Sequence, residues 1–221
     1  MPILSYILTA LGAYLLGSIP TGFLVAKAKG IDIRAVGSGN IGATNAMRVL
    51  GKPAGIAVLL MDVVKGYLAS AIFPAMLYNI FFAQSWADVF ENHPAEFQMR
   101  FKLLAGICAV LGHNYTCWLK FKGGKGIATT AGVYLALAWP ALLIALAVFV
   151  LAILLTKYVS VGSISAAIAL PVSVWLMTPH NLFLGSVTTA LGLLAIYKHK
   201  SNIQRLMAGT ENRLGQKKES K

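Results

Sequence analysis

Residues 36–48, VGSGNIGATNAMR, combine the residue types that bind an anion. Three glycines, at positions 37, 39 and 42, allow successive backbone N–H groups to turn toward one point. Short polar side chains add further donors at the same place, and Arg48 adds a planar guanidinium suited to phosphate oxygens; these side chains are Ser38, Asn40, Thr44 and Asn45. A flexible glycine-rich loop is the alternative interpretation of such a pattern, because glycine spacing alone is a weak signal.

Two further segments repeat this chemistry. Residues 121–126, FKGGKG, place Lys125 among glycines, although the spacing differs from that of a nucleotide-binding P-loop. In the tail, His199, Asn202 and Arg205 are three and six positions apart and would share one helix face, with Glu211 available as a carboxylate partner for Arg205 or Arg213. A solvated helix face is the alternative interpretation of His199, Asn202 and Arg205. Basic anchors at membrane-helix ends are the alternative interpretation of Lys27, Lys29, Lys198 and Lys200.

The composition is that of a polytopic membrane protein. Of the 221 residues, 57% are hydrophobic and 12% charged, and the mean hydropathy is +0.72, whereas soluble domains carry about 25% charged residues. The net charge of +12 is distributed between apolar segments rather than along one continuous face, which excludes a nucleic-acid binder. Cys108 and Cys117 lie in or beside one apolar segment without metal-ligand spacing, and we expect both to be free thiols.

Apolar runs long enough for helices alternate with polar connections. Pro140 should interrupt the thirty-residue run 127–156, so we predict two short helices there, joined at Trp139 and Pro140. Asp62 and Lys65, three positions apart inside the second run, share a helix face and can pair. Residues 30–53 and 81–102 are expected to be polar connections, and the first run is a retained helix rather than a signal peptide. The predicted runs are 3–26, 54–80, 103–119, the two halves of 127–156, 163–177 and 182–197.

The positive charges predict the orientation. Lys and Arg number five in residues 27–52, three in 120–125, one at Lys157 and seven from Lys198 to the end. By the positive-inside rule, seven helices place the N-terminus outside and the C-terminus in the cytoplasm, and reading 127–156 as one helix gives the alternative of six. The seven-helix topology puts the two glycine segments, residues 160–163 and the tail on one membrane face.

Patterns of other chemistries are missing from the chain. No His is followed by Asp five positions later, as in coenzyme A-dependent glycerolipid acyltransferases, and no aspartate-rich pattern for Mg²⁺ occurs. No Cys, His and carboxylate cluster suits zinc or iron. We therefore predict anion recognition without a metal.

Three motifs, in order, resemble those of the bacterial acyl-phosphate:glycerol-3-phosphate acyltransferases, the PlsY family. They are GSGNIGATNAMR (37–48), GHNYTCWLKFKGGKGIAT (112–129) and HKSNIQRLMAGTENR (199–213). The resemblance covers essentially the whole chain and implies an all-α integral membrane enzyme with seven transmembrane helices, forming one domain over residues 1–221. It implies transfer of an acyl group from fatty acyl phosphate to glycerol 3-phosphate, giving lysophosphatidic acid and inorganic phosphate. It also implies a bacterial inner-membrane enzyme with a cytoplasmic site, without cofactor or metal, which we expect to be a monomer.

The resemblance assigns roles to particular residues. The acyl phosphate would be held by Gly37, Ser38, Gly39, Asn40, Gly42, Ala43, Thr44 and Asn45. Glycerol 3-phosphate would be held by Arg48, Lys125, Ser163, His199 and Asn202. Ser38, Asn45, Arg48, Lys125 and His199 form the implied catalytic set.

The acyl phosphate carries a leaving group that is already a stable anion, so the enzyme must mainly position two anionic substrates and stabilise the carbonyl oxyanion. The glycerol hydroxyl loses its proton either to His199 or to a substrate phosphate oxygen, and the number of cations favours the phosphate. An organic-phosphate transporter or channel is the alternative function, but its site would lie near the bilayer midplane between repeats. A structural membrane protein would leave the loop at 37–45 unexplained.

Overall fold

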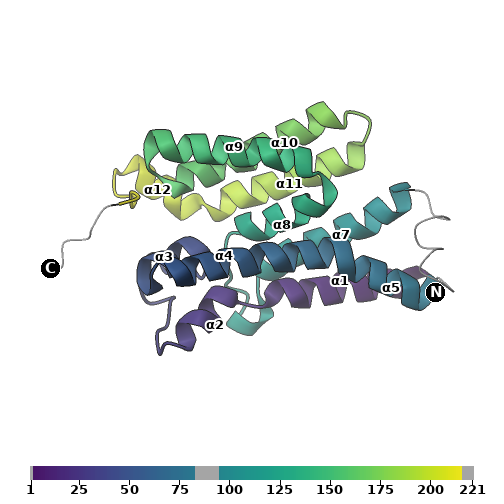
Figure 1. The fold of residues 1–221 in the computed structure, drawn as a ribbon, viewed down its shortest axis with the longest axis horizontal. Coiled ribbons are helices and arrows are strands. Elements are labelled where there is room, and N and C mark those ends of the chain that lie inside the picture. The colour runs from purple at the N-terminus through teal and green to yellow at the C-terminus, as the bar shows by residue number, and fades with distance from the viewer. Residues whose placement is uncertain (1, 83–94, 216–221) are drawn as a thin grey trace. The chain divides into compact units, whose positions relative to one another are not determined.

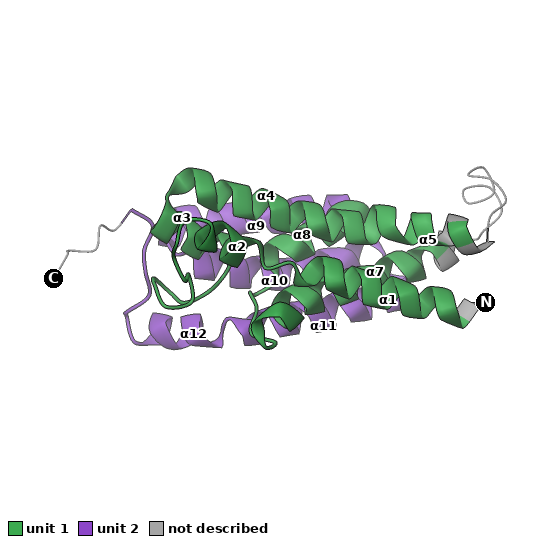
Figure 2. Ribbon diagram, turned by 90° about the horizontal axis from the view of Figure 1, so that it is seen from below, with its two compact units in different colours: residues 1–137 green, residues 138–221 purple. Residues whose placement is uncertain are grey.

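The computed structural model describes residues 2–82 and 95–215, and all regular secondary structure in these two ranges is helical. The chain forms two compact units, residues 1–137 and residues 138–221 (Figure 2). The all-α prediction is therefore confirmed for the described part of the chain.

The first unit is built around three long helices, α1, α4 and α7 (Figure 1). α1 lies beside α7, while α4 packs against α3 and α8. Its elements are α1 (Pro2–Ser18), α2 (Thr21–Lys27), α3 (Ala43–Leu50), α4 (Lys52–Tyr67), the π-helix η1 (Leu68–Ile72), α5 (Phe73–Phe82), α7 (Ala95–Asn114), the 3-10 turn η2 (Cys117–Leu119) and α8 (Ile127–Leu137).

Glycines allow these helices to approach closely. A Cβ at Gly17 of α1 would overlap the backbone of Ala109 in α7, and one at Gly66 of α4 would overlap the backbone of Thr129 in α8. Small residues at such contacts let helix backbones pack tightly where lipid, rather than water, surrounds the protein.

The first apolar run is broken near its end. The sequence predicted one helix over residues 3–26, whereas the structure ends α1 at Ser18 and begins α2 at Thr21. Pro20 explains the break, because it lacks an N–H and disfavours helical backbone at Ile19.

The segment 30–53, expected to be a polar connection, contains the helix α3. Its apolar residues Ala43, Ala46 and Leu50 lie at helical spacing and pack into a buried cluster with Val58 of α4. The connection expected at 81–102 is also shorter than predicted, because α5 reaches Phe82 and α7 begins at Ala95. The rest of that predicted connection lies outside the described residues.

The second unit contains α9 (Trp139–Thr156), α10 (Val159–Met177), α11 (Leu182–Lys198) and α12 (Lys200–Met207). α10 packs against both α9 and α11. A left-handed residue, Lys157 at φ 65°, ends α9, and the Asn181 side chain caps α11 by accepting the Leu184 N–H at 3.0 Å. The predicted interruption of residues 127–156 is confirmed, since α8 ends at Leu137 and Pro140 lies in the first turn of α9.

Four helical segments of the described residues are long and apolar enough to cross a membrane, and a fifth is possible if the bent pair α11 and α12 is one span. The four are Ile3–Lys27, Lys52–Leu77, Trp139–Thr156 and Val159–Met177. This supports a multi-pass membrane protein.

Candidate functional site

The side chain of Asn45 holds the glycine loop of residues 37–45 in shape. Its Oδ1 accepts the backbone N–H of Ser38 at 2.8 Å, and its Nδ2 donates to the carbonyls of Ile33, Val36 and Asn40 at 3.2, 3.1 and 2.9 Å. Asn45 is fully buried, and Gly37 and Gly39 take the positive φ values that the loop requires. The structure thus assigns Asn45 to the framework of the loop, while its predicted place at the reacting centre stays a prediction.

The glycine loop leads directly into α3. Gly42 is the N-cap residue of this helix, and its N–H is bonded to the Asn40 side chain at 2.8 Å. The first N–H groups of a helix have no partner within the helix, and the helix dipole favours an anion beside them. Thr44 lies in the first turn of α3, and the exposed Arg48 follows it by four positions. Thr44 and Arg48, both predicted to bind an anion, therefore lie on the helix that follows the glycine loop.

A salt bridge lies before the loop. The Arg34 guanidinium bonds both oxygens of Asp32, at 2.9 and 2.7 Å, and the Arg34 backbone N–H adds a third bond at 3.0 Å. These bonds lower the pKa of Asp32 to about 2 and raise the pKa of Arg34. Arg34 also lies 4.9 Å from the ring of Phe23, which connects this turn to α2.

The second glycine segment, residues 121–126, lies between α7 and α8. Lys120 and Phe121 adopt left-handed backbone conformations, and Gly126 (φ 82°) immediately precedes α8. Lys125, predicted to bind phosphate, is half-buried beside this helix start.

An apolar cluster joins the two loops inside the first unit. Leu119, between α7 and the second loop, packs into the same buried cluster as Ile33 and Ile41 of the first loop region and Ala46 of α3. The structure therefore places the segments of Ser38, Arg48 and Lys125 at the same end of this unit, while their predicted place on one membrane face stays a prediction.

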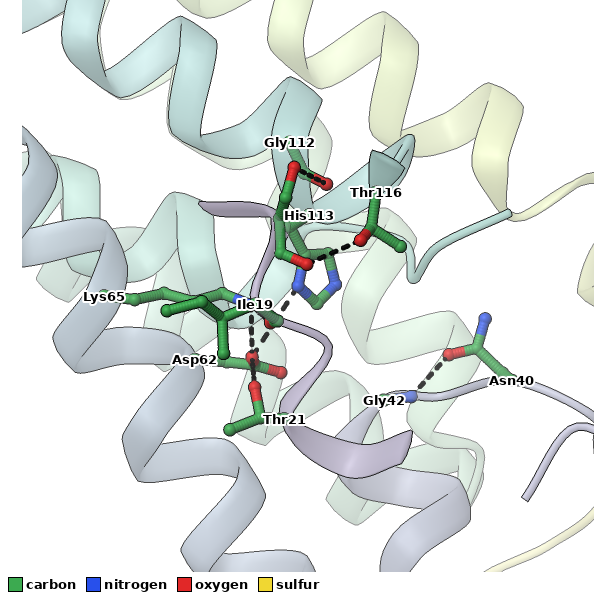
Figure 3. Close-up of polar contacts among 10 residues, drawn as sticks. Ile19, Thr21, Asn40, Gly42, Asp62, Lys65, Gly112, His113 and Thr116 are labelled. Carbon is green, nitrogen blue, oxygen red and sulfur yellow. Dashed lines mark hydrogen bonds and ion pairs between the residues drawn. The ribbon is translucent and has the colours of Figure 1, made fainter. Parts of the chain in front are cut away.

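Beneath the loops lies a buried polar network (Figure 3). Asp62 of α4 pairs with Lys65 at 2.8 Å, which confirms the predicted pairing, and accepts the Thr21 hydroxyl at 2.5 Å. Nδ1 of His113 in α7 lies 3.6 Å from the same carboxylate oxygen, and Lys65 also donates to the Ile19 carbonyl at 2.9 Å. The sequence spacing revealed Asp62 and Lys65, but the contacts to Thr21 and His113 come from residues too distant in the chain to be inferred.

In the second unit, His199 lies at the bend between α11 and α12. Its Nδ1 is 2.8 Å from the Ala195 carbonyl, and only 3% of the residue is exposed. A carbonyl can only accept, so Nδ1 carries the proton and the lone pair of the neutral ring is on Nε2. Ser163, in the first turns of α10, is buried and donates to the Val159 carbonyl at 3.0 Å.

Asn202 and Arg205 share one partner, Glu211. Asn202 Nδ2 donates to Glu211 at 2.9 Å and Arg205 Nε donates to its other oxygen at 2.8 Å. Of the two arginines predicted as alternative partners of Glu211, Arg205 makes the ion pair at 2.8 Å. Arg213 donates to the Tyr158 hydroxyl at 2.8 Å. The contact of Asn202 with Glu211 was not predicted. His199 is the residue before α12 rather than part of its face.

The structure thus groups the predicted residues within units. Ser38, Asn45, Arg48 and Lys125 belong to the first, and Ser163, His199 and Asn202 to the second. Cys108 and Cys117 are free thiols, as expected. Among residues 2–82 and 95–215, no three His, Cys, Asp or Glu side chains gather as metal ligands would.

Helices throughout the described residues, several of them candidate membrane spans, are the architecture of an integral membrane protein. The chain belongs to the glycerol-3-phosphate acyltransferase family, whose model matches residues 7–209.

Curated relatives with that name match this chain over nearly their full length. The glycerol-3-phosphate acyltransferase of Geobacter sulfurreducens is 45% identical over 207 residues, 94% of this chain and 96% of the relative. That of Thermosynechococcus vestitus is 47% identical over 210 residues, 94% of each chain.

Two solved structures are similar across 96% of both chains. One is a crystal structure of PlsY (YgiH), an integral membrane glycerol 3-phosphate acyltransferase, in its glycerol 3-phosphate form, with a TM-score of 0.80 and 37% identity. The other is its lysophosphatidic acid form, with a TM-score of 0.77 and 36% identity.

Proposed function

We propose that this chain transfers a fatty acyl group from an acyl phosphate to the 1-hydroxyl of sn-glycerol 3-phosphate. The products are lysophosphatidic acid and inorganic phosphate. One observation carries the proposal: the loop of residues 37–45, held by Asn45, leads into the N-terminus of α3 and so offers backbone N–H groups to an anion. The family relationship and the relatives' names support the acceptor, glycerol 3-phosphate.

The acyl phosphate supplies a mixed anhydride, so its phosphate departs as a stable anion. The glycerol hydroxyl oxygen attacks the acyl carbon, the bond from that carbon to the phosphate oxygen breaks, and the hydroxyl proton passes to a base. Fixed N–H groups and cations lower the barrier by stabilising the oxyanion and by holding both substrates in line. We propose that residues 37–45 hold the acyl phosphate, with Ser38 and Asn45 nearest the reacting carbon.

Glycerol 3-phosphate is bound, in this proposal, by Arg48, Lys125, Ser163, His199 and Asn202. A phosphate oxygen of a substrate is the proposed base, and His199 is the second candidate because its neutral tautomer carries the lone pair on Nε2. Neither role requires a metal or a cofactor.

We propose that residues 1–221 form one membrane-embedded domain that acts as a monomer. The span of the family match, residues 7–209, crosses the boundary between the two units and supports this. In the proposed topology, the bent pair α11 and α12 is a fifth span beside the four candidate spans, and α7 and α8 also cross the bilayer, which gives seven transmembrane helices. The C-terminus and the site then lie on the cytoplasmic side of the bacterial inner membrane. The distribution of Lys and Arg supports this orientation.

The test is phosphate release by the detergent-purified protein supplied with palmitoyl phosphate and glycerol 3-phosphate, in EDTA and without coenzyme A. We expect release to depend on both substrates, to yield lysophosphatidic acid and to collapse in Arg48→Ala. Lys29→Ala, which removes another exposed cation of the first unit, is the matched control and should keep wild-type turnover.

Absence of turnover with both acyl phosphate and acyl coenzyme A, from protein shown to be folded, would contradict the proposal. The transporter alternative, which the relatives do not support, would then be tested by counterflow of labelled glycerol 3-phosphate in liposomes.

A further inference from the structure

The buried carboxylate of Asp62 contacts one residue next to each glycine loop of the first unit, Thr21 and His113. Asp62 is 2% exposed and lies in the interior of α4, 2.5 Å from the Thr21 hydroxyl and 3.6 Å from His113 Nδ1. Thr21 begins α2, and His113 lies in the last turn of α7 (Figure 3). Side chains from α2, α4 and α7 thereby meet at one carboxylate oxygen atom.

The Thr21 contact leads to the first loop. Gly22, the next residue, packs so closely on the glycine loop that a Cβ there would overlap the carbonyl oxygen of Ile41. Ile41 directly precedes Gly42, the N-cap residue of α3. A shift of Thr21 would therefore move the start of α3, where we place the acyl phosphate.

The His113 contact leads to the second loop. The His113 carbonyl accepts the Gly124 N–H at 3.0 Å, and the Asn114 carbonyl accepts the Gly123 N–H at 3.2 Å. The His113 ring fills the space that a Cβ at Gly124 would occupy. Lys125, the next residue, is the proposed ligand of glycerol 3-phosphate, so a displaced His113 ring would disturb the segment that carries this cation.

Lys65 balances the charge of Asp62 and donates to the Ile19 carbonyl at the break between α1 and α2. A buried ion pair of this kind can often be replaced by apolar side chains without loss of stability. The role of the ion pair therefore lies at least partly in positioning the groups around it, and not only in stabilising the fold.

We propose that Asp62 is a positioning residue of the acyltransferase, which sets the two anion-binding loops in register through Thr21 and through His113. This inference rests on the proposed function, because it treats the loops as the binding sites of the two substrates. Asp62 itself touches neither substrate; it acts through the two loops.

The first experiment replaces the ion pair by apolar residues, Asp62→Leu with Lys65→Met, and measures thermal unfolding and the kinetics with both substrates. We expect the double variant to fold with a lower unfolding midpoint, because the Thr21 hydroxyl and the Ile19 carbonyl lose their partners. At a temperature where it is fully folded, kcat/KM should fall about tenfold or more, since misplacement by about 1 Å can cost about 100-fold. Asp62→Asn with Lys65→Met keeps an acceptor oxygen for Thr21 and should recover most of the activity. Thr189→Val removes a hydrogen bond from Trp175 in the second unit and should leave the kinetics unchanged.

The second experiment separates the two contacts and leaves the ion pair in place. Thr21→Val should raise KM mainly for the acyl phosphate, and His113→Asn should raise KM mainly for glycerol 3-phosphate. A purely structural role would lower stability in both variants without such a split. These single variants also decide the question if the apolar pair does not fold.

Wild-type kinetics in the folded apolar pair, or in both single variants, would overturn the inference while leaving the proposed function intact. An inactive wild-type protein would contradict the proposed function instead. In that case calorimetric binding of inorganic phosphate tests the inference, since Asp62→Leu with Lys65→Met should weaken it and unchanged binding would refute the positioning role.

Discussion

The Asn45 side chain accepts the backbone N–H of Ser38, seven positions earlier in the chain, at 2.8 Å. The same side chain donates to three carbonyls, so all of its hydrogen-bonding groups face the loop backbone. The conformation of the glycine loop is thus determined by one buried amide rather than by the glycines alone, which only permit it.

Asn45→Asp should abolish most of the activity and lower the unfolding midpoint. The carboxylate keeps the acceptor for Ser38 but turns an oxygen toward three carbonyls, and each buried group left without its bond costs about 1–3 kcal/mol. Phosphate release and thermal unfolding in detergent measure both effects. Thr44→Ser, one residue earlier in the half-buried first turn of α3, is the control for a mild change; equal losses in the two variants would argue against a special role of Asn45.

The salt bridge before the loop should resist acid. The pKa of Asp32 is depressed to about 2, so its contribution to the folded state is present above the ordinary value of 3.8 and is lost only as pH falls through about 2. Carbon NMR of labelled Asp32 should show its midpoint near that pH. Arg34→Gln should move the midpoint back toward 3.8, and an unchanged midpoint would exclude the Arg34 bonds as the cause.

Local patterns predicted much of this architecture correctly. Pro140 indicated the break between α8 and α9, and the spacing of Asp62 and Lys65 indicated their pairing. The same rule, applied to Pro20, would have indicated the break between α1 and α2. The helix α3 was hidden among glycines and polar residues, although Ala43, Ala46 and Leu50 already have helical spacing.

The contacts that assemble the site could not be read from the sequence. Thr21 reaches Asp62 across 41 residues, and the order of the chain gives no sign of this contact. Asn202 and Glu211 are nine positions apart, and they meet only because the chain turns back after α12. Motifs therefore indicated which residue types matter, whereas tertiary packing determined which of them touch.

Gly124→Ala should reduce activity by displacing the His113 ring, because the added methyl group would occupy the same space. The double variant with His113→Ala makes room for the methyl group, so it should be no less active than His113→Ala alone. Steady-state kinetics of the three proteins form the test. Strictly multiplicative losses would show that the two residues act independently.

His199→Gln should keep most of kcat and raise KM for glycerol 3-phosphate. This follows from the proposal that a substrate phosphate takes the hydroxyl proton, so that the imidazole binds and does not act as base. The measurement is initial-rate kinetics with glycerol 3-phosphate varied at saturating acyl phosphate. A fall of kcat by about 100-fold or more at unchanged KM would instead identify His199 as the base, since general-base help contributes about 10²–10⁴-fold.

Glu211→Gln should lower the stability of the second unit mainly through the loss of the ion pair with Arg205, because its contact with Asn202 can be kept. The amide still offers Asn202 an oxygen acceptor. It removes, however, the negative charge of the almost fully buried Glu211 carboxylate, which Arg205 contacts at 2.8 Å. Loss of one partner of such a pair leaves the other charge unbalanced, so we expect a clearly lower unfolding midpoint. Arg205→Met combined with Glu211→Gln should recover part of this stability, because the unbalanced charge is gone. If the double variant is as unstable as Glu211→Gln alone, the ion pair is not what Glu211 contributes, and its bond to Asn202 becomes the remaining explanation.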